Sequence, residues 1–361
     1  MTRTLTLTAL AALLAAPAMA EGSLHIYNWS DYIAEDTIEK FEAETGIDVT
    51  YDVYDSNETL EAKLLAGNSG YDIVVPSSNF MQRQIAAGVY QPIDKSLLPN
   101  LANMDPELTG KAANYDPDNA HSVIWMWGTI GIGYNVEAVR ERLGDDAPTD
   151  SWALVFDPQY AEKLADCGIS FLDAPSDMLQ SAMAFAGVDP TSTDAADIEK
   201  GAEVLTAVRP FVRYFHSSQY ISDLANGEVC VSVGFSGDVF IAAARAEEAA
   251  NGIEVAYSVP DEGAQLWFDM MGIPVDAPNP EAAHAWMNFV MQPQITADIT
   301  NYVWYANANA ASMDLVDPEI AGDPAIFPPA EVRAKLFPTV VYGPRVDRVI
   351  TRLWTTVKTG Q

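Results

Sequence analysis

The stretch LHIYNWSDYIAEDTIEKFEAETGIDVTYDVY, residues 24–54, contains the pattern that decides the fold class. Leu24–Trp29 is predicted to be a strand, and Asp36–Glu44 a helix that stops at Gly46. Ile47–Tyr54 alternates in hydrophobicity and predicts a second strand. A strand, a helix and a strand in this order indicate two parallel strands joined by a right-handed crossover.

The same alternation continues outward from this stretch. Asn57 is expected to cap a helix that runs to Ala66, Tyr71–Val75 is a short buried strand, and a further helix ends at Gly88. From about residue 129 the pattern restarts, with strands predicted at Gly131–Asn135, Gly168–Leu172, Val212–Phe215 and Val229–Phe235 and helices at Asp177–Ala186, Ile198–Val208 and Asp238–Ala250. The remaining chain is expected to form two extended runs within Ala256–Val275 and helices at Pro280–Met291, Gln294–Tyr302 and Pro344–Val357. Two α/β units without a flexible linker predict two lobes joined by crossing strands.

The first twenty residues have the features of a secretory signal peptide. Arg3 precedes an apolar run, Leu5–Ala16, which is too short to span a membrane. Ala18 and Ala20 flank a methionine in a small-x-small cleavage site, so cleavage is expected after Ala20. The mature protein is therefore expected to be exported.

The charge balance restricts the partners. The chain has 19 basic and 51 acidic residues, a net charge of −32. Nucleic acid and anionic membranes are poor partners for such a field, whereas a cationic ligand would be attracted. Alternatively, the excess of acidic residues could serve only to keep the protein soluble. The two cysteines, Cys167 and Cys230, are an even pair in an exported chain and suggest one disulfide.

Motifs for catalysis or cofactor binding are missing. The Gly131-x-Gly133 pair lacks the third glycine of a dinucleotide site, and neither a phosphate-binding loop nor a GxSxG motif occurs. The four histidines are isolated, without metal-ligand spacing. We expect no cofactor and no metal, and a secreted hydrolase is the minority alternative to a binding protein.

Three aromatic residues stand next to acids where strands are predicted to end. These pairs are Trp29 with Asp31, Phe235 with Asp238, and Trp267 with Asp269. Ligands of open α/β sheets sit beyond the carboxyl ends of the strands. Structural roles remain open, since Asp238 could cap the following helix and Trp267 could be a core residue.

Such pairs would suit an aliphatic polyamine. Its ammonium groups need carboxylates, because an unpaired buried charge is very costly. Its methylene groups need apolar walls, and aromatic faces also attract cations. A sugar would call for more amide and guanidinium donors, and an amino acid would call for an arginine that none of the three motifs contains.

At these residues the chain resembles the periplasmic polyamine-binding proteins of bacterial ABC transporters, most closely the putrescine-binding branch. The resemblance covers essentially the whole mature chain and is carried by LHIYNWSDYIA, YDVYDSNE, YDIVVPSS, GIGYN, CGISFLDAP, RYFHSSQYISDLANG, YANAN and PPAEVRAKLF. It implies a type II periplasmic-binding-protein fold, with two α/β lobes joined by crossover strands and a ligand cleft between them. It also implies a monomer that closes on putrescine or spermidine in the periplasm and docks on an inner-membrane permease.

The resemblance also assigns site residues. Trp29 and Trp267 would be walls, Asp238 and Asp269 the main ammonium partners, and Ser30, Asp31, Ser77 and Tyr305 further contacts. Asp177 stands where the putrescine binder has Glu, and Phe235 where Trp is usual. Cys167 and Cys230 match the disulfide pair of the family.

Trp267 bears most on selectivity, because the putrescine binder has Phe at this place and spermidine-binding relatives tend to have Trp. We therefore expect putrescine to be preferred narrowly over spermidine; the alternatives are a spermidine-preferring binder, a binder of another small solute, and a sensor role for the same cleft. The expected lobes are residues 21–128 plus 262–312 and residues 129–261 plus 313–361.

Overall fold

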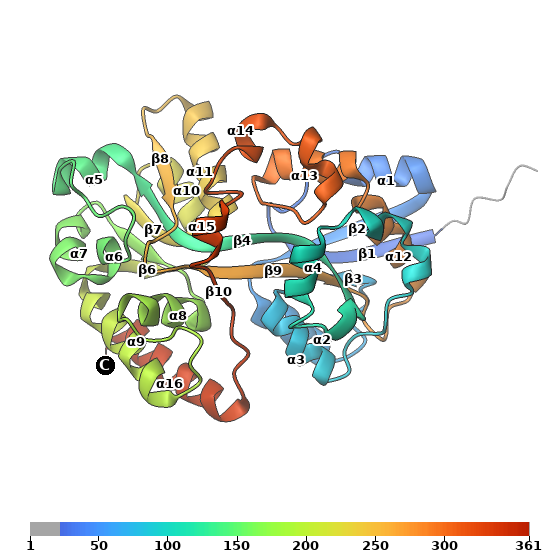
Figure 1. The fold of residues 1–361 in the computed structure, drawn as a ribbon, viewed down its shortest axis with the longest axis horizontal. Helices are drawn as coiled ribbons and strands as arrows, with labels where there is room; N and C mark the ends of the chain where they lie inside the picture. Colours follow the sequence, from blue (N-terminus) through green and yellow to red (C-terminus); the bar gives the residue numbers. More distant parts are fainter. Residues whose placement is uncertain (1–21, 361) are drawn as a thin grey trace, which may run out of the picture.

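The computed structural model describes residues 22–360, which form two lobes placed side by side (Figure 1). The predicted signal peptide, residues 1–20, lies outside the described residues. The strands are β1 (Gly22–Trp29), β2 (Ile47–Tyr54), β3 (Ile73–Val74), β4 (Ser122–Asn135), β5 (Ile169–Phe171), β6 (Val212–Phe215), β7 (Val231–Phe235), β8 (Val255–Ser258), β9 (Gln265–Gly272) and β10 (Phe337–Pro338).

Helices cover the sheets in both lobes. The first eight are α1 (Thr37–Thr45), α2 (Asn57–Leu65), α3 (Ser78–Ala86), α4 (Pro106–Ala112), α5 (Val136–Leu143), α6 (Ala153–Phe156), α7 (Pro158–Leu164) and α8 (Pro175–Phe185). The others are α9 (Ala195–Val208), α10 (Gln219–Ala225), α11 (Ser236–Ala249), α12 (Pro280–Val290), α13 (Pro293–Val303), α14 (Pro318–Ala321), α15 (Ala330–Arg333) and α16 (Pro344–Thr359). Within residues 22–360, none of these helices combines the length and the apolar character that crossing a membrane requires.

The strands β4 and β9 cross between the lobes (Figure 1). β4 pairs with β9 in antiparallel fashion from Ser122 to Thr129, and its second half pairs with β7 from Ile130 to Tyr134. The strand order is β2-β1-β3-β9-β4-β7-β5-β6, so β1–β3 lie on one side of the crossing pair and β5–β7 on the other. We refer to these sides as the first and the second lobe. The predicted α/β fold with two crossover strands is confirmed.

The opening stretch folds as predicted. β1 and β2 are parallel, paired in register from Gly22 with Ile47 to Trp29 with Tyr54. Between them α1 ends at Gly46, which takes the left-handed conformation (φ 71°) that glycine adopts without steric cost. Because the two strands are parallel and in register, their carboxyl ends open onto the same edge of the sheet.

Two details of the prediction are wrong. The helix α2 is capped by Ser56, whose Oγ accepts the N–H of Thr59 at 3.2 Å, and not by Asn57. The strand predicted at Gly131–Asn135 is the end of the much longer β4. β4 is buried on both faces along nearly its whole length, so its first half has no polar alternation from which a strand could be recognised.

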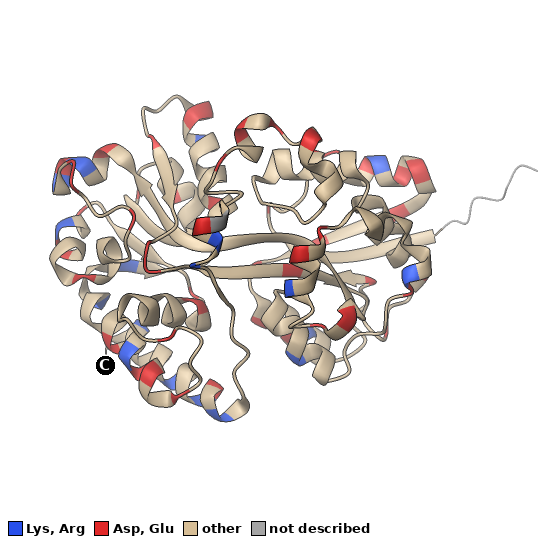
Figure 2. Ribbon diagram, in the orientation of Figure 1, with Lys and Arg blue, Asp and Glu red and all other residues tan. Residues whose placement is uncertain are grey.

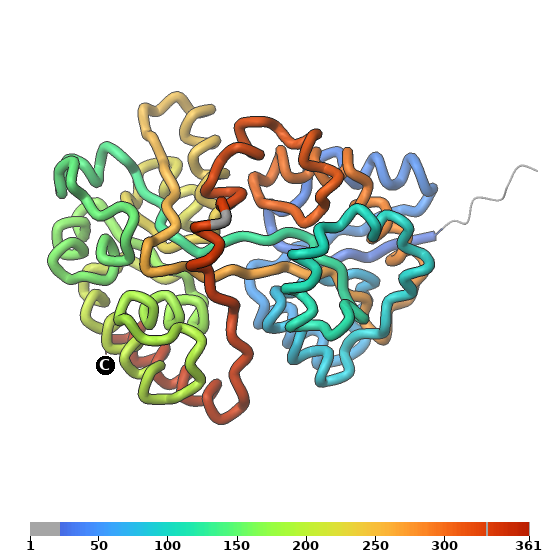
Figure 3. Tube along the Cα trace, viewed as in Figure 1, coloured from blue at the N-terminus to red at the C-terminus, as the bar shows by residue number. Residues whose placement is uncertain are grey.

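The last part of the chain runs through the first lobe and then ends in the second. Val316 and Ile320 belong to the same buried cluster as Tyr27 on β1 and Trp127 on the crossing strand β4. After α15 the chain passes the crossing strands and continues into α16, which ends beside α9 (Figure 3). There Trp354 packs edge-on against Phe215, with ring centroids 5.3 Å apart.

The expected disulfide joins Cys167 and Cys230, whose Cα atoms are 5.5 Å apart. The two cysteines precede β5 and β7, which are parallel neighbours with Ile169 opposite Val231. The bond therefore joins the entrances of two adjacent strands within the second lobe, at the ends opposite to those where β5 and β7 finish.

Candidate functional site

A cleft of about 1030 Å³, including its open mouth, lies between the lobes. Its walls come from the segments that follow β1, β2, β3, β5, β6, β7 and β10, together with β9 and the segment after α13. All ten residues predicted to bind ligand line it: Trp29, Ser30, Asp31, Ser77, Asp177, Phe235, Asp238, Trp267, Asp269 and Tyr305. The fold therefore brings to one cleft the side chains that the resemblance assigned from distant segments of the chain, and their contacts with a ligand stay a prediction.

The end of β1 places Trp29 at the cleft. Trp29 lies opposite Tyr54 at the end of β2, and the two rings are 4.7 Å apart. The indole N–H of Trp29 donates to the carbonyl of Val75 at 2.9 Å, just after β3. The polar edge of Trp29 is thus satisfied within the first lobe, and its partly buried ring is held in a fixed orientation as a wall. Ser30 is exposed, and its N–H donates to the carbonyl of Tyr54 at 3.1 Å.

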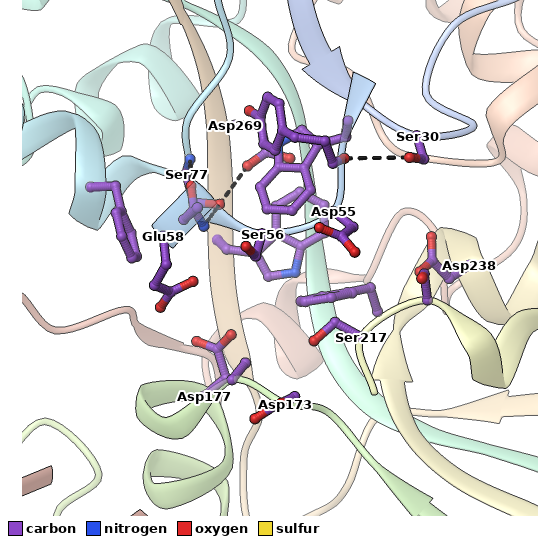
Figure 4. Close-up of a pocket in the computed structure, with 18 of the residues that line it drawn as sticks. Ser30, Asp55, Ser56, Glu58, Ser77, Asp173, Asp177, Ser217, Asp238 and Asp269 are labelled. Carbon is purple, nitrogen blue, oxygen red and sulfur yellow. Dashed lines mark hydrogen bonds between the residues drawn. The ribbon is translucent and has the colours of Figure 1, made fainter. Parts of the chain in front are cut away.

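Asp269, on β9, is a buried carboxylate of the cleft. It is only 5% exposed, and its Oδ1 accepts the hydroxyl of Ser77 at 2.7 Å (Figure 4). Ser77 is held in turn by the amide group of Asn57, which donates to its Oγ and accepts its N–H, both at 3.0 Å. Burial raises the pKa of Asp269 to about 7, and the hydrogen bond from Ser77 opposes the rise.

Asp238 lies in the first turn of α11 and is held by two tyrosines. Its Oδ2 accepts the hydroxyl of Tyr220 at 2.7 Å, and its Oδ1 accepts the hydroxyl of Tyr305 at 2.6 Å. The N-cap position of α11 is Phe235, and no side chain of that position caps the helix. The capping role that the sequence left open for Asp238 is therefore wrong. Burial raises the pKa of Asp238 to about 6, while its hydrogen bonds to the tyrosines lower it.

Asp177 faces the cleft from the first turn of α8. Its Oδ1 accepts the side-chain amide of Gln265 at 3.1 Å. Burial raises the pKa of Asp177 to about 7, and the nearby carboxylate of Glu58 adds to the rise. Asp177 therefore belongs to the second lobe but hydrogen-bonds to the crossing strand β9.

Three aromatic residues of the cleft, Phe235, Trp267 and Tyr305, pack together. The ring of Trp267 stands perpendicular to that of Phe235, at 6.0 Å and 87°, and packs against Tyr305 at 5.5 Å. Trp267 is 6% exposed, so it is both a core residue and part of the cleft lining. The two aromatic residues that the resemblance connects with selectivity, Phe235 and Trp267, therefore pack against each other.

Asp31 occupies the mouth of the cleft. Its backbone takes the left-handed conformation (φ 54°), one that Asp adopts more readily than most residues. Its side chain is 56% exposed and lies 3.4 Å from the guanidinium of Arg245 on α11. Asp31 is thus not sequestered, and within the protein it faces a cation of the other lobe.

In the described part of the chain, the ionisable acidic and basic side chains that line the cleft are all acids. Among residues 22–360, the side chains that line it include seven acids and no lysine, arginine or histidine. Figure 4 shows Glu58 and Ser77 on one side, Asp173 and Asp177 opposite them, and Asp238 at one end. Basic residues lie on helices and loops elsewhere in both lobes (Figure 2). A cation entering this cleft would meet carboxylates on both sides.

Several lining residues were not predicted, among them Tyr54, Asp55, Glu58, Asp173 and Ser217. Asp55 directly follows β2, Glu58 lies in the first turn of α2, and Asp173 follows β5, so the rule that ligands bind beyond strand ends would also have found them. Asp173 accepts the indole N–H of Trp354 at 3.0 Å and is paired with Lys358 at 2.6 Å, which ties it to α16.

The sequence matches the family model of bacterial extracellular solute-binding proteins over residues 36–328. The chain is 52% identical over 345 residues to the putrescine-binding periplasmic protein PotF of Escherichia coli, covering 95% of this chain and 93% of that protein. It is also 52% identical over 338 residues to the putrescine-binding periplasmic protein SpuD of Pseudomonas aeruginosa, covering 94% and 92%.

The fold agrees with these matches. The crystal structure of PotD from Streptococcus pneumoniae, a spermidine/putrescine ABC transporter substrate-binding protein, superimposes with a TM-score of 0.78 at 28% identity, covering 94% of this chain and 99% of that one. The chain therefore belongs to the bacterial extracellular solute-binding proteins, a family of binding proteins and not of enzymes, and is similar along nearly its whole length to periplasmic polyamine-binding members.

Proposed function

We propose that this protein captures a polyamine in the cleft, with putrescine narrowly preferred over spermidine, and delivers it to the permease of an ABC transporter. The observation that carries the proposal is the lining of the cleft, which among the described residues has seven acids and no basic side chain. A dication would neutralise buried carboxylates that otherwise repel one another, and this gain favours binding.

The arrangement of the lining fits an extended diamine. Asp238 and Asp269 take one ammonium group each, because both are fixed by hydroxyl donors and keep further acceptor capacity. The rings of Trp29, Phe235, Trp267 and Tyr305 contact the methylene groups between them. Ser30, Asp31, Ser77 and Asp177 complete the polar contacts.

Binding closes the lobes. The ligand contacts residues of both lobes at once only in the closed form, so it shifts the population toward that form. We propose that the lobes divide near residue 128, within the crossing strand β4, and near residue 261, just before the crossing strand β9, as the sequence predicts. For the last boundary we propose a position near 328 in place of 313, because Val316, Ile320 and Ile326 belong to the buried cluster of the first lobe.

The remaining features of the proposal concern the setting. The protein is exported to the periplasm after cleavage following Ala20, acts as a monomer, and does not bind nucleic acid. The net charge of −32 supports the last point, since a phosphate backbone would be repelled. The permease is an inner-membrane partner that binds the closed, ligand-loaded form of the protein.

Two other ligand classes compete with putrescine. Spermidine has a third ammonium group, and Glu58 and Asp177 are acids of the cleft toward which it could extend. An amino acid fits less well, because its carboxylate would lie among the seven acids without a basic side chain to pair with it.

A thermal unfolding series tests the proposal. The protein is first unfolded and refolded to remove carried-over ligand, and is then heated with putrescine, cadaverine, agmatine or spermidine. Ligand at one hundred times its dissociation constant should stabilise the fold by about 2.7 kcal/mol. Butylamine and 4-aminobutyrate are the matched controls, because each has only one of the two ammonium groups of putrescine. The proposal fails if none of the four amines raises the melting temperature above these controls.

A further inference from the structure

The hydroxyl of Tyr220 joins two elements of the cleft without lining it. Tyr220 is fully buried on α10, and its hydroxyl donates to Asp238 Oδ2 at 2.7 Å. The same hydroxyl accepts the backbone N–H of Phe235 at 2.9 Å. One atom of a buried side chain thus contacts both the proposed ammonium partner and the backbone of a proposed wall.

The ring of Tyr220 is held in place by the sheet. It passes over Gly234 of β7, where a Cβ atom would lie 2.6 Å from the ring. Glycine at this position allows the close approach, because any other residue would displace the ring. The position of the hydroxyl is therefore set by the packing of α10 on β7.

The hydroxyl takes the place of a helix cap. Phe235 is the N-cap residue of α11 and provides no side-chain cap. The hydroxyl of Tyr305 repeats the arrangement, since it accepts the N–H of Asp238 at 3.0 Å and donates to Asp238 Oδ1. Backbone N–H groups at the start of a helix carry partial positive charge. Each tyrosine therefore accepts from this positive end and donates to the carboxylate, and successive hydrogen bonds of this kind polarise one another.

The charge state of Asp238 depends on its whole surroundings. The titratable and charged groups that face it from the packed elements are Tyr220 on α10, Tyr305 after α13, Asp31 and Tyr32 after β1, Asp269 on β9 and Arg245 on its own helix. Burial and Asp31 raise the pKa of Asp238, whereas the two tyrosine hydroxyls and Arg245 lower it. Loss of one hydroxyl would raise that pKa further.

We infer that Tyr220 is a positioning residue for amine binding, which holds Asp238 ionised and oriented and fixes the backbone of Phe235 beside it. This inference rests on the proposed function and deepens it, because it names a residue outside the cleft surface that sets the pH range of binding. An ammonium ligand gains from a carboxylate and not from a carboxylic acid, so amine affinity should fall as the pH drops through the titration of Asp238.

The test measures putrescine affinity by calorimetry between pH 5.5 and 8.5 for the wild type, Tyr220→Phe and Tyr257→Phe. Tyr257 is the matched control, because it is a partly buried tyrosine whose hydroxyl bonds to Thr129 at 2.8 Å and not to Asp238. For Tyr220→Phe we expect affinity at pH 8 to fall about tenfold, as for a lost hydrogen bond to a charged group. We also expect the midpoint of the pH profile to rise by about one unit. Tyr257→Phe should leave the midpoint unchanged.

Other outcomes overturn the inference. If Tyr220→Phe binds putrescine more weakly by the same factor at every pH and the midpoint of the pH profile is unchanged, Tyr220 has only a packing role. If the putrescine affinity of this variant is unchanged, Tyr220 has no role in binding. If Tyr220→Phe does not fold, Gly234→Ala serves as the second variant. It keeps the hydroxyl but displaces the ring, so it should raise the midpoint as well, and an unchanged midpoint in that variant contradicts the inference. Absence of amine binding by the wild type would instead contradict the proposed function.

Discussion

Arg245 of the second lobe and Asp31 of the first form an ion pair of 3.4 Å at the mouth of the cleft. Both side chains are substantially exposed, at 40% and 56%. Solvent screens such a pair, so it contributes at most about 1 kcal/mol. Its importance lies in its position, because it joins the two lobes across the mouth of the cleft and would be lost if the proposed closure were reversed.

Replacing Arg245 with Gln should therefore affect closure more than folding. We expect putrescine to dissociate about two- to fivefold faster from the variant, since the closed form loses up to about 1 kcal/mol. Stopped-flow displacement measures this rate. Arg140→Gln is the control, because Arg140 pairs with Glu137 within a single helix. If dissociation from the two variants is equally fast, the pair at the mouth has no role in closure.

Because of the buried carboxyls of the cleft, we expect two quantities to change in opposite directions with pH. These are the stability of the ligand-free protein and the stabilisation that putrescine adds. Burial raises the pKa of Asp177 and Asp269 to about 7 and that of Asp238 to about 6, all above the unfolded value of 3.8. Raised values mean that the folded state binds protons more tightly than the unfolded chain. Their contribution to stability is thus present near pH 4 and is lost as the pH rises through 6 to 7.

We therefore expect the melting temperature of the ligand-free protein to fall between pH 5 and pH 8 because of these groups. The rise in melting temperature caused by putrescine should grow over the same range, since the amine binds the ionised form. Asp269→Asn removes one titrating carboxyl. Both the fall in melting temperature of the free protein and the growth of the putrescine effect with pH should therefore be smaller in this variant. Curves for the variant that parallel those of the wild type would show that Asp269 does not titrate in this range.

The sequence predicted the parts of the fold that depend on local pattern. The strand pair of residues 24–54 could be recognised because its polar and apolar residues alternate and Gly46 stops the helix between them. The first half of β4 could not, because a strand buried on both faces has no alternation. The contact between Asp31 and Arg245 joins residues 214 positions apart, and no local pattern brings such residues together.

In the candidate site, too, some residues could be predicted from the local sequence pattern and others could not. Asp238, just beyond β7, could be predicted because ligands bind beyond strand ends. The sequence also places Asp269 at a strand end, and this is wrong, because Asp269 lies within the crossing strand β9. Tyr220 could not be predicted, because a buried tyrosine on a short helix has the same sequence pattern whether its hydroxyl supports a site or only fills the core. That distinction appears only in the hydrogen bonds of the folded chain.

The disulfide should stabilise the second lobe without affecting the cleft. It joins residues separated by 63 positions, and such a loop is worth about 2–4 kcal/mol. We expect Cys167→Ala/Cys230→Ala to lose about this much in urea unfolding. Putrescine affinity should change less than about threefold, since the bond lies at the ends of β5 and β7 that face away from the cleft. A larger loss of affinity would mean that the bond positions the binding residues.

The contact between Phe235 and Trp267 predicts that these positions act together on selectivity. Each single change, Phe235→Trp or Trp267→Phe, alters the volume of one corner of the cleft, so each should change the ratio of spermidine to putrescine affinity. The double variant exchanges the two rings, and its affinity ratio should differ by more than about twofold from the value obtained by adding the two single effects as free energies. Calorimetry on the four proteins completes the cycle. Simple addition of the two single effects would contradict coupling through the ring contact.

The most direct test is calorimetric titration of the refolded, ligand-free wild type and of Asp238→Asn with putrescine at pH 8. We expect one putrescine to bind per wild-type chain. Asp238→Asn should bind more weakly by about 2–5 kcal/mol, because the ammonium loses a desolvated carboxylate partner. If the wild type shows no binding of putrescine or spermidine, or if Asp238→Asn binds putrescine as tightly as the wild type, the account of a polyamine held by the cleft carboxylates is wrong.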